Sequence, residues 1–125
     1  MKHRHLNISI MLNEFTIVGY VGRDPEVRRL ENGVAVARFN VATTDTWKDH
    51  NGDKCQKVEW HKVVAYRSLA EISEKYVKKG SLLLVKGKIE YQEYTDREDI
   101  KRTVTNLVAS TVKVLDRVQK YDDEE

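Results

Sequence analysis

The sequence predicts an all-β fold in which one helix interrupts five strand regions, between the third and the fourth. Apolar and polar side chains alternate over most of the chain, which is the period of a half-buried strand. Only one stretch, residues 68–80, changes to helical spacing. The chain has 125 residues, 34% of them charged, and no apolar run of membrane-spanning length. One globular domain is therefore expected, without a membrane partner.

Three strand regions are expected before the helix. The first begins near residue 12 and ends at Gly22-Arg23-Asp24-Pro25, because proline cannot donate to a sheet ladder. After a short segment, the hairpin signal Asn32-Gly33 introduces a long strand from Val34 to Trp47. A second Asn-Gly pair, Asn51-Gly52, then turns the chain back into the third region, Val58 to Tyr66.

The helix and two further strand regions follow. Ser68-Leu69-Ala70-Glu71 has the form of a capping box, and Gly80 supplies a left-handed stop. Strand patterns resume from Leu82 to Gln92 and, after a polar turn, from Ile100 to about Val114. This order is that of the OB-fold, a five-stranded Greek-key barrel whose binding face suits oligonucleotides and oligosaccharides.

The third strand region divides its side chains between two faces. Trp60, Lys62 and Tyr66 share one face, and His61 lies on the other. A face that is aromatic, basic and aromatic in turn suits a single-stranded nucleic acid, whose bases stack on flat rings. The alternative is a half-buried strand whose two aromatic residues fill the core, which is the commoner use of aromatic residues in strands.

Both ends of the chain are charged. The last four residues, Asp122-Asp123-Glu124-Glu125, are acidic, whereas all 22 basic residues precede them, so the rest of the chain is moderately basic. The basic opening has no apolar core of a secretory signal, so it is expected to be a disordered arm, a presequence remnant or an extension upstream of Met11. We therefore expect a flexible extension over residues 1–11, an OB-fold domain over 12–115 and an acidic tail over 116–125. The single cysteine, Cys55, cannot form an internal disulfide, which favours a reducing compartment.

Several segments resemble one known family. Val18-Gly19-Tyr20-Val21-Gly22-Arg23-Asp24-Pro25-Glu26-Val27-Arg28 resembles the opening strand and turn of bacterial-type single-stranded DNA-binding proteins, the SSB family. Similar segments continue in the family's order: Asn32-Gly33, Ala42-Thr43-Thr44, Glu59-Trp60-His61, Leu69-Ala70-Glu71 and Tyr76-Val77-Lys78-Lys79-Gly80-Ser81. The resemblance covers roughly residues 12 to 114. It implies a non-enzymatic protein that binds single-stranded DNA without sequence preference in replication, recombination and repair, needs no cofactor or metal, and assembles as a homotetramer.

The resemblance also assigns residues. The family's base-stacking positions correspond to Trp47, Trp60, Tyr66 and Tyr94. Its basic positions correspond to Arg28, Lys48, Lys54, Lys62, Lys79 and Arg102. His61 matches a residue that the family uses at a subunit contact. The acidic tail lacks the family's apolar tip, so recruitment of partner proteins through it is not expected. The implied location is the bacterial cytoplasm, at the nucleoid, or alternatively a mitochondrion or another organelle.

Two other functions are compatible with an OB-fold. The first is a replication accessory or RNA-binding protein that uses the same face. The second is a metal-dependent nuclease, which needs converging carboxylates to hold its metal. Asp96, Glu98 and Asp99 are close in sequence, but they lie in an expected exposed turn. His3 and His5 lack a clustered third ligand.

Overall fold

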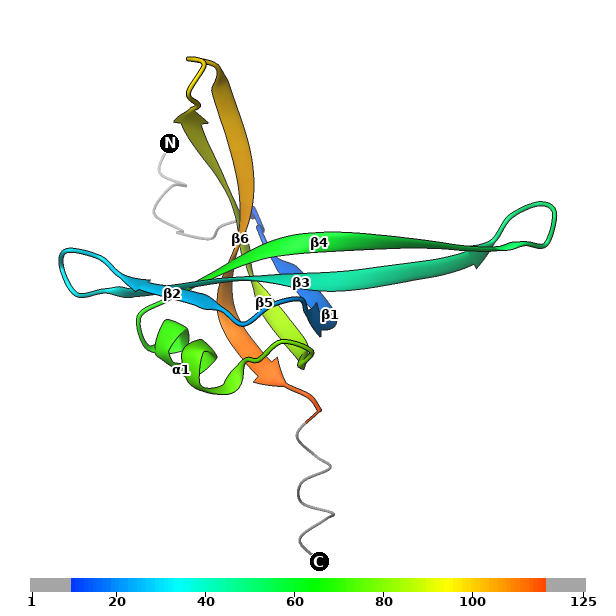
Figure 1. The fold of residues 1–125 in the computed structure, drawn as a ribbon, viewed down its shortest axis with the longest axis horizontal. Coiled ribbons are helices and arrows are strands. Elements are labelled where there is room, and N and C mark those ends of the chain that lie inside the picture. The colour runs from blue at the N-terminus through cyan, green and yellow to red at the C-terminus, as the bar shows by residue number, and fades with distance from the viewer. Residues whose placement is uncertain (1–9, 117–125) are drawn as a thin grey trace, which may run out of the picture.

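The computed structural model of the chain describes residues 10–116. The expected extension, residues 1–11, and the expected acidic tail, residues 116–125, lie almost entirely outside this range. The described residues form six strands and one helix (Figure 1). In chain order these are β1 (Phe15–Val21), β2 (Glu26–Arg29), β3 (Ala35–Lys48), β4 (Lys54–Tyr66), α1 (Ser68–Tyr76), β5 (Leu82–Thr95) and β6 (Lys101–Val114).

The strands form one closed sheet. Their order is β1-β5-β6-β4-β3-β2, and an additional pairing between β1 and β3 closes the sheet into a barrel. β1 ends against β3 at the pair Val21–Val41, and β2 resumes along the same strand from the pair Glu26–Arg38. The break falls before β2 at Pro25, which cannot donate to the ladder. The first two strands therefore share one strand position, and the predicted OB-fold of five strand positions with one inserted helix is confirmed.

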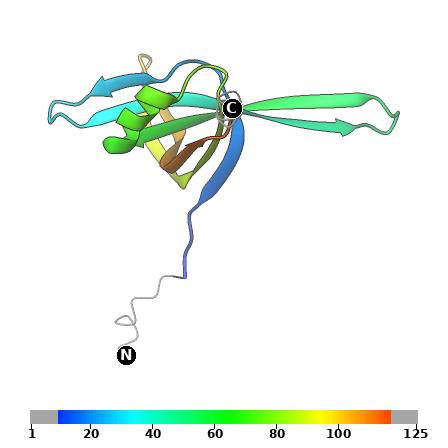
Figure 2. The same cartoon turned by 90° about the horizontal axis from the view of Figure 1, so that it is seen from below.

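One strand pair differs from the others in direction. β4 and β6 pair in parallel over only two positions, Val63 with Leu107 and Val64 with Val108. Beyond this point β4 and β6 diverge. β4 stays paired with β3 and β6 stays paired with β5, and the two pairs leave the barrel as long ribbons (Figure 1). We call residues 44–58 the β3–β4 arm and residues 90–106 the β5–β6 arm. The β2–β3 hairpin extends to the side opposite the β3–β4 arm (Figure 2).

Branched apolar side chains fill the barrel. Five of them are at most 1% exposed: Val41, Val63, Val77, Leu83 and Val85. α1 packs beneath the β2–β3 end of the barrel (Figure 1 and Figure 2) and contributes the buried residues Ala70 and Ser73. The buried hydroxyl of Ser73 donates to the carbonyl oxygen of Leu69 at 2.8 Å, so the helix buries a polar group without leaving it unpaired.

The expected capping box at the start of α1 is wrong. Ser68 is already the first helical residue, the cap is Arg67, and no side chain caps the helix. The reason is that the N–H of Arg67 donates to the carbonyl oxygen of Ala35 at 2.8 Å, which prolongs the pairing of β4 with β3 by one position. The chain can leave the sheet only at Arg67, which has φ 59° and ψ −129°.

The end of α1 also differs from the expectation. The helix ends at Tyr76, and Val77 is already extended and fully buried in the core. Gly80, the expected helix stop, has a φ of 87° in the loop that follows. Its N–H donates to the carbonyl oxygen of Val21 at 2.8 Å, so it forms the turn into β5 instead.

Two glycines allow neighbouring strands of the barrel to approach closely. A Cβ at Gly19 would lie 2.2 Å from the carbonyl oxygen of Ala42, where β1 passes β3. A Cβ at Gly87 would lie 1.9 Å from the carbonyl oxygen of Val108, next to the irregular step in the β5–β6 pairing. Both contacts are with backbone atoms, so no change of side-chain rotamer could relieve them.

Gly87→Ala is expected to destabilise the fold by about 3 kcal/mol, because β5 and β6 must separate to admit the methyl group. The matched control is Gly52→Ala in the β3–β4 turn, where the added Cβ meets nothing within 4 Å but φ is 85°. That change should cost only about 1–2 kcal/mol, from the backbone conformation alone. Urea unfolding midpoints measure both, and equal losses would contradict the close crossing at Gly87.

Candidate nucleic-acid interface

β4 divides its side chains between the core and the solvent as the sequence predicts. Val63 and Ala65 are 1% and 0% exposed and belong to the core. On the other side of the strand Trp60 is 57% exposed, Tyr66 is 36% exposed, and Lys62 between them is also exposed. We call this side of β3 and β4 the outer face. Its two aromatic rings do not fill the core, which removes the alternative explanation for them.

The outer face continues from β4 onto β6. Val64 lies on this face, is only 2% exposed, and pairs with Val108 of β6. Alternation along β6 from Val108 brings Arg102 to the same face, and Arg102 pairs with Tyr94 across the β5–β6 arm. Three of the four predicted stacking residues therefore share one face: Trp60, Tyr66 and Tyr94.

Trp47 is the exception. It pairs with Cys55 near the end of the β3–β4 arm, whereas Trp60 pairs with Ala42. An odd number of positions separates Trp47 from Ala42 along β3, so the side chain of Trp47 leaves the ribbon on the opposite side. Its ring is 47% exposed. The structure thus keeps Trp47 accessible but does not bring it onto the outer face.

The predicted basic residues fall into separate groups. Lys62 follows Trp60 on the outer face and pairs with Asn40. Lys48 and Lys54 face each other across the end of the β3–β4 arm. Arg28 lies on β2 opposite Val36, which pairs in turn with Tyr66. Each of these basic groups therefore lies near one of three predicted stacking residues: Trp60, Trp47 and Tyr66.

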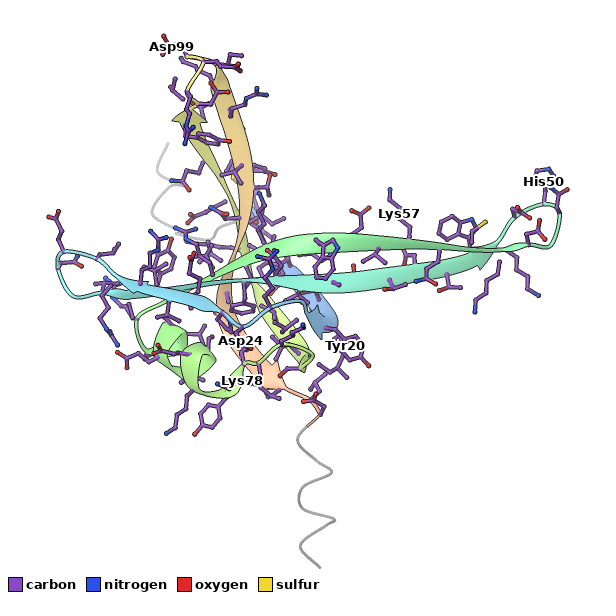
Figure 3. The ribbon with its side chains drawn as sticks, viewed as in Figure 1. Tyr20, Asp24, His50, Lys57, Lys78 and Asp99 are labelled. Carbon is purple, nitrogen blue, oxygen red and sulfur yellow. The ribbon has the colours of Figure 1, made fainter. Side chains whose placement is uncertain are left out.

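Lys79 and Arg102 are placed differently. The backbone N–H of Lys79 donates to Asp24 Oδ1 at 2.8 Å, at the lower end of the barrel and away from the tips of both arms (Figure 3). Arg102 is on the outer face beside Tyr94, but its Nε is 2.9 Å from Asp96 Oδ2. Asp96 thus partly neutralises the charge that was expected to meet a phosphate.

Sequence reasoning missed part of this face. A groove of about 390 Å³ runs across it from the β1–β2 turn to β6. Besides Lys62, its lining includes Arg23, Arg38, Asn40 and Asn106, together with two carboxylates. Alternation places Arg38 and Asn40 together, but only the strand register shows that they face Lys62 and Val64.

A second groove, of about 340 Å³, lies where the two arms diverge. Trp60 and Lys62 line it from β4, and Thr103 and Thr105 line it from β6. No pattern in the sequence shows where β4 and β6 meet, so this groove could not be predicted. It opens the side of Trp60 that faces the β5–β6 arm.

The comparisons with known proteins agree with this geometry. Residues 12–115 match the family model described as the Single-strand binding protein family. The chain belongs to the SSB family. Two curated relatives from Neisseria meningitidis, serogroups A and B, are named single-stranded DNA-binding protein, and each is 45% identical over 104 residues. The matched region is 83% of this chain and 60% of each relative, so this SSB-family chain spans 60% of their length.

Further matches support the same family. The single-stranded DNA-binding protein 1 of Xylella fastidiosa is 40% identical over 109 residues, which is 86% of this chain and 80% of the relative. Among solved structures, one described as Plasmodium falciparum SSB in complex with ssDNA superposes with a TM-score of 0.79 at 27% identity. That likeness covers 87% of this SSB-family chain and 99% of the other.

Gly22 supports Trp60 in this SSB-family chain. A Cβ at Gly22 would lie 2.6 Å from Cζ3 and 2.9 Å from Cη2 of the Trp60 indole. The ring therefore rests on the β1–β2 turn at a position that only glycine leaves open. This contact gives an exposed ring a defined place on the outer face, which reduces the entropy lost when a ligand packs against it.

His61 lies on the side of β4 opposite Trp60. Its Nε2 is 2.8 Å from the Oγ1 of Thr43, which lies on the adjacent strand β3. This bond orients the imidazole at the base of the β3–β4 arm. The role of His61 in a subunit contact stays a prediction.

The tip of the β5–β6 arm is organised by Asp96. Its carboxylate accepts hydrogen bonds from the N–H groups of Ile100 and Glu98 and from Arg102 Nε. The bonds from Ile100 and from Arg102 hold the pKa of Asp96 below its usual value. Within residues 10–116, no three His, Cys, Asp or Glu side chains converge to hold a metal ion. In the same range no helix is long and apolar enough to cross a membrane.

Gly22→Ala is expected to displace the Trp60 indole from the β1–β2 turn while leaving the barrel folded, because the new methyl group meets only the far end of one side chain. In a Trp47→Phe background, Trp60 emission should shift to the red and acrylamide should quench it faster. Gly33→Ala is the control: its Cβ meets nothing within 4 Å, so it adds only the backbone strain of a φ of 87° and should leave the emission of Trp60 unchanged. Unchanged Trp60 emission in Gly22→Ala would show that the ring does not rest there.

The low pKa of Asp96 predicts a local effect of acid. Folding lowers the pKa of Asp96, so its hydrogen bonds stabilise the turn fully at a pH well above the unfolded pKa of about 3.9. This stabilisation is lost as the pH falls through the pKa of Asp96 in the folded chain. In an NMR acid titration, the Ile100 amide signal should move together with the Asp96 carboxyl signal, with a midpoint below about 3.9. Asp96→Asn should abolish the transition at Ile100. A midpoint at or above the ordinary value would contradict the hydrogen bonding described.

Proposed function

We propose that this chain binds single-stranded DNA without sequence preference through the outer face. The observation that carries the proposal is the composition of β4, where Trp60, Lys62 and Tyr66 are exposed on one side while Val63 and Ala65 fill the core on the other. Membership of the SSB family supports it, as do relatives named single-stranded DNA-binding protein. So does a structural neighbour described as a complex with ssDNA.

The chemistry of the face fits a flexible strand better than a duplex. Stacking of one base on an aromatic ring is worth about 1–3 kcal/mol, and every base has a π-face, so affinity arises without base readout. Duplex bases are already stacked on each other and cannot cover these rings. Basic side chains such as Lys62 and Arg38 would neutralise phosphates and release counterions. Binding alone achieves protection of single strands in replication, recombination and repair, so the proposed activity is not enzymatic and needs no cofactor.

The parts of the face are expected to contribute unequally. Trp60 lines the groove between the arms, and Lys62, two positions along β4, lines both grooves, so Trp60 is proposed as the centre of the site. Tyr94 is proposed as the weakest stacking residue, since its neighbour Arg102 is paired with Asp96 and Glu93 precedes it. Trp47 would meet a strand only after it passes around the edge of the β3–β4 arm, whereas Lys48 and Lys54 lie on the same side of that arm as Trp60.

Assembly and location are part of the same proposal. The family resemblance supports a homotetramer, with His61 at a subunit contact, in a bacterial cytoplasm at the nucleoid or alternatively in an organelle. The acidic residues of the tail, 122–125, lie outside the described residues, and no recruitment of partner proteins through them is proposed.

Trp60→Ala is expected to weaken binding of fluorescently labelled dT oligomers about 10-fold or more, because it removes one stacking surface of about 1–3 kcal/mol. His61→Ala, on the opposite side of β4, should leave the intrinsic affinity largely unchanged and lower the mass in sedimentation. Fluorescence anisotropy at several salt concentrations measures the first effect. If both variants lost affinity and mass alike, the two sides of β4 would not have separate roles.

The same titration should include RNA and duplex DNA of matched sequence. The proposal expects affinity for dT to exceed that for duplex by a wide margin. Equal affinity for duplex would contradict it. A preference for RNA would favour the alternative of an RNA-binding accessory protein.

A further inference from the structure

Arg67 lies between β4 and α1 and has a backbone conformation that residues other than glycine avoid. Its φ is 59° and its ψ is −129°, so it lies outside the left-handed helical region that an L-residue can tolerate. Among residues 10–116 the only other non-glycine residue with positive φ is Asp99. Asp99 sits in a tight turn and is of a type that tolerates such angles. Arginine has no comparable local reason to be at position 67.

The fold requires this turn but does not require arginine. The N–H of Arg67 donates to the carbonyl oxygen of Ala35 at 2.8 Å, which ties it to β3. Its own carbonyl oxygen accepts from the N–H of Glu71 at 3.2 Å, which is the first bond of α1. Both peptide groups are fixed, so the dihedral angles between them are fixed too. Glycine would adopt these angles without strain.

The Arg67 side chain forms no ion pair within residues 10–116 that would offset the strain. The residue is exposed, and no carboxylate of residues 10–116 lies within ion-pair distance of its guanidinium. Its neighbours differ in this respect, since Arg28 is 3.5 Å from Glu26 and Arg29 is 3.4 Å from Glu71. The charge of Arg67 is therefore free to meet a ligand.

Arg67 is also the chain neighbour of a predicted stacking residue. It directly follows Tyr66, at about 3.8 Å between Cα atoms. Tyr66 pairs with Val36, and Val36 lines a groove of about 380 Å³ together with Arg28 and Arg38. Beyond Tyr66 the outer face therefore carries Arg38 on β3 and Arg28 on β2, with Glu26 in the same groove. The planar guanidinium suits a phosphate group, which it can bind through two parallel hydrogen bonds.

We propose that Arg67 binds a backbone phosphate next to the base that stacks on Tyr66, and that arginine is retained at this strained position for that contact. The inference rests on the proposed binding of single-stranded DNA and extends it by a residue that belongs to neither the aromatic nor the basic set assigned from the sequence. It also predicts that replacing Arg67 with glycine makes the fold more stable and the binding of single-stranded DNA weaker.

The test compares three substitutions at residue 67 in the full chain. Arg67→Gly removes both the charge and the strain, Arg67→Ala removes the charge and keeps the strain, and Arg67→Lys keeps both. Affinity for a dT oligomer is measured by anisotropy over a range of salt concentrations, and Tm is measured at one protein concentration. Lys75→Ala, which removes a positive charge from α1, controls for a general electrostatic effect.

One phosphate contact on a single strand contributes about 0.7 to the slope of log K against log salt concentration, equivalent to about fivefold in affinity at 0.1 M salt. Arg67→Gly and Arg67→Ala should both lose this amount, whereas Arg67→Lys and Lys75→Ala should keep the slope. Arg67→Gly should also raise Tm by a few degrees above that of Arg67→Ala.

Each outcome decides a separate point. If the wild-type protein binds dT and the glycine and alanine variants keep its affinity and slope, the Arg67 contact is wrong while the proposed function stands. If affinity falls in both variants but their Tm values are equal, the contact holds and the claim of strain is wrong. If the wild-type protein does not bind dT at low salt, the proposed function fails, and the Arg67 contact fails with it.

Discussion

The two-position parallel pairing between β4 and β6 is the constraint on which the rest of the structure depends. It joins Val63 and Val64 to Leu107 and Val108, and it is the only parallel contact in the described sheet. Because it is so short, the two strands separate immediately and each continues as an antiparallel ribbon with its other neighbour. The separation exposes Trp60 and opens the groove between the arms.

Much of this architecture follows from local patterns in the sequence. Period-two alternation identifies the strands, Pro25 marks the break in the first strand position, and Asn32-Gly33 marks the first hairpin. The division of β4 into a core side and an exposed side also follows from alternation alone, because side chains in a strand must alternate. Whether the exposed aromatic side of β4 was core or interface could not be decided locally. The answer depends on which strands lie beside β4, and only the exposed fractions of Trp60 and Tyr66 in the folded chain show that this side is not core.

The rest could not be predicted because it depends on register and on long-range hydrogen bonds. Trp47 and Trp60 come from one hairpin, yet the pairing of Trp47 with Cys55 sends its ring to the other side of the ribbon. Ser68 has the sequence of a helix cap, but the bond from Arg67 to Ala35 moves the start of the helix by one residue. In both cases a difference of one residue along the chain decides which face of the sheet a side chain occupies or at which residue the helix begins. Strand geometry makes such shifts decisive, since a single step reverses the face.

The central claim is that the outer face, with Trp60 and Tyr66, is the main surface that receives the bases. Photo-crosslinking to a dT oligomer containing 5-bromodeoxyuridine, followed by mass spectrometry of the peptides, tests it most directly. Adducts at Trp60 and Tyr66 are predicted, with weaker labelling at Tyr94. Tyr91 is the natural comparison, because it is 71% exposed and lies three positions from Tyr94 on β5, which places it on the opposite side of the β5–β6 arm. Labelling mainly at Tyr91, with Trp60 and Tyr66 unmodified, would contradict the account.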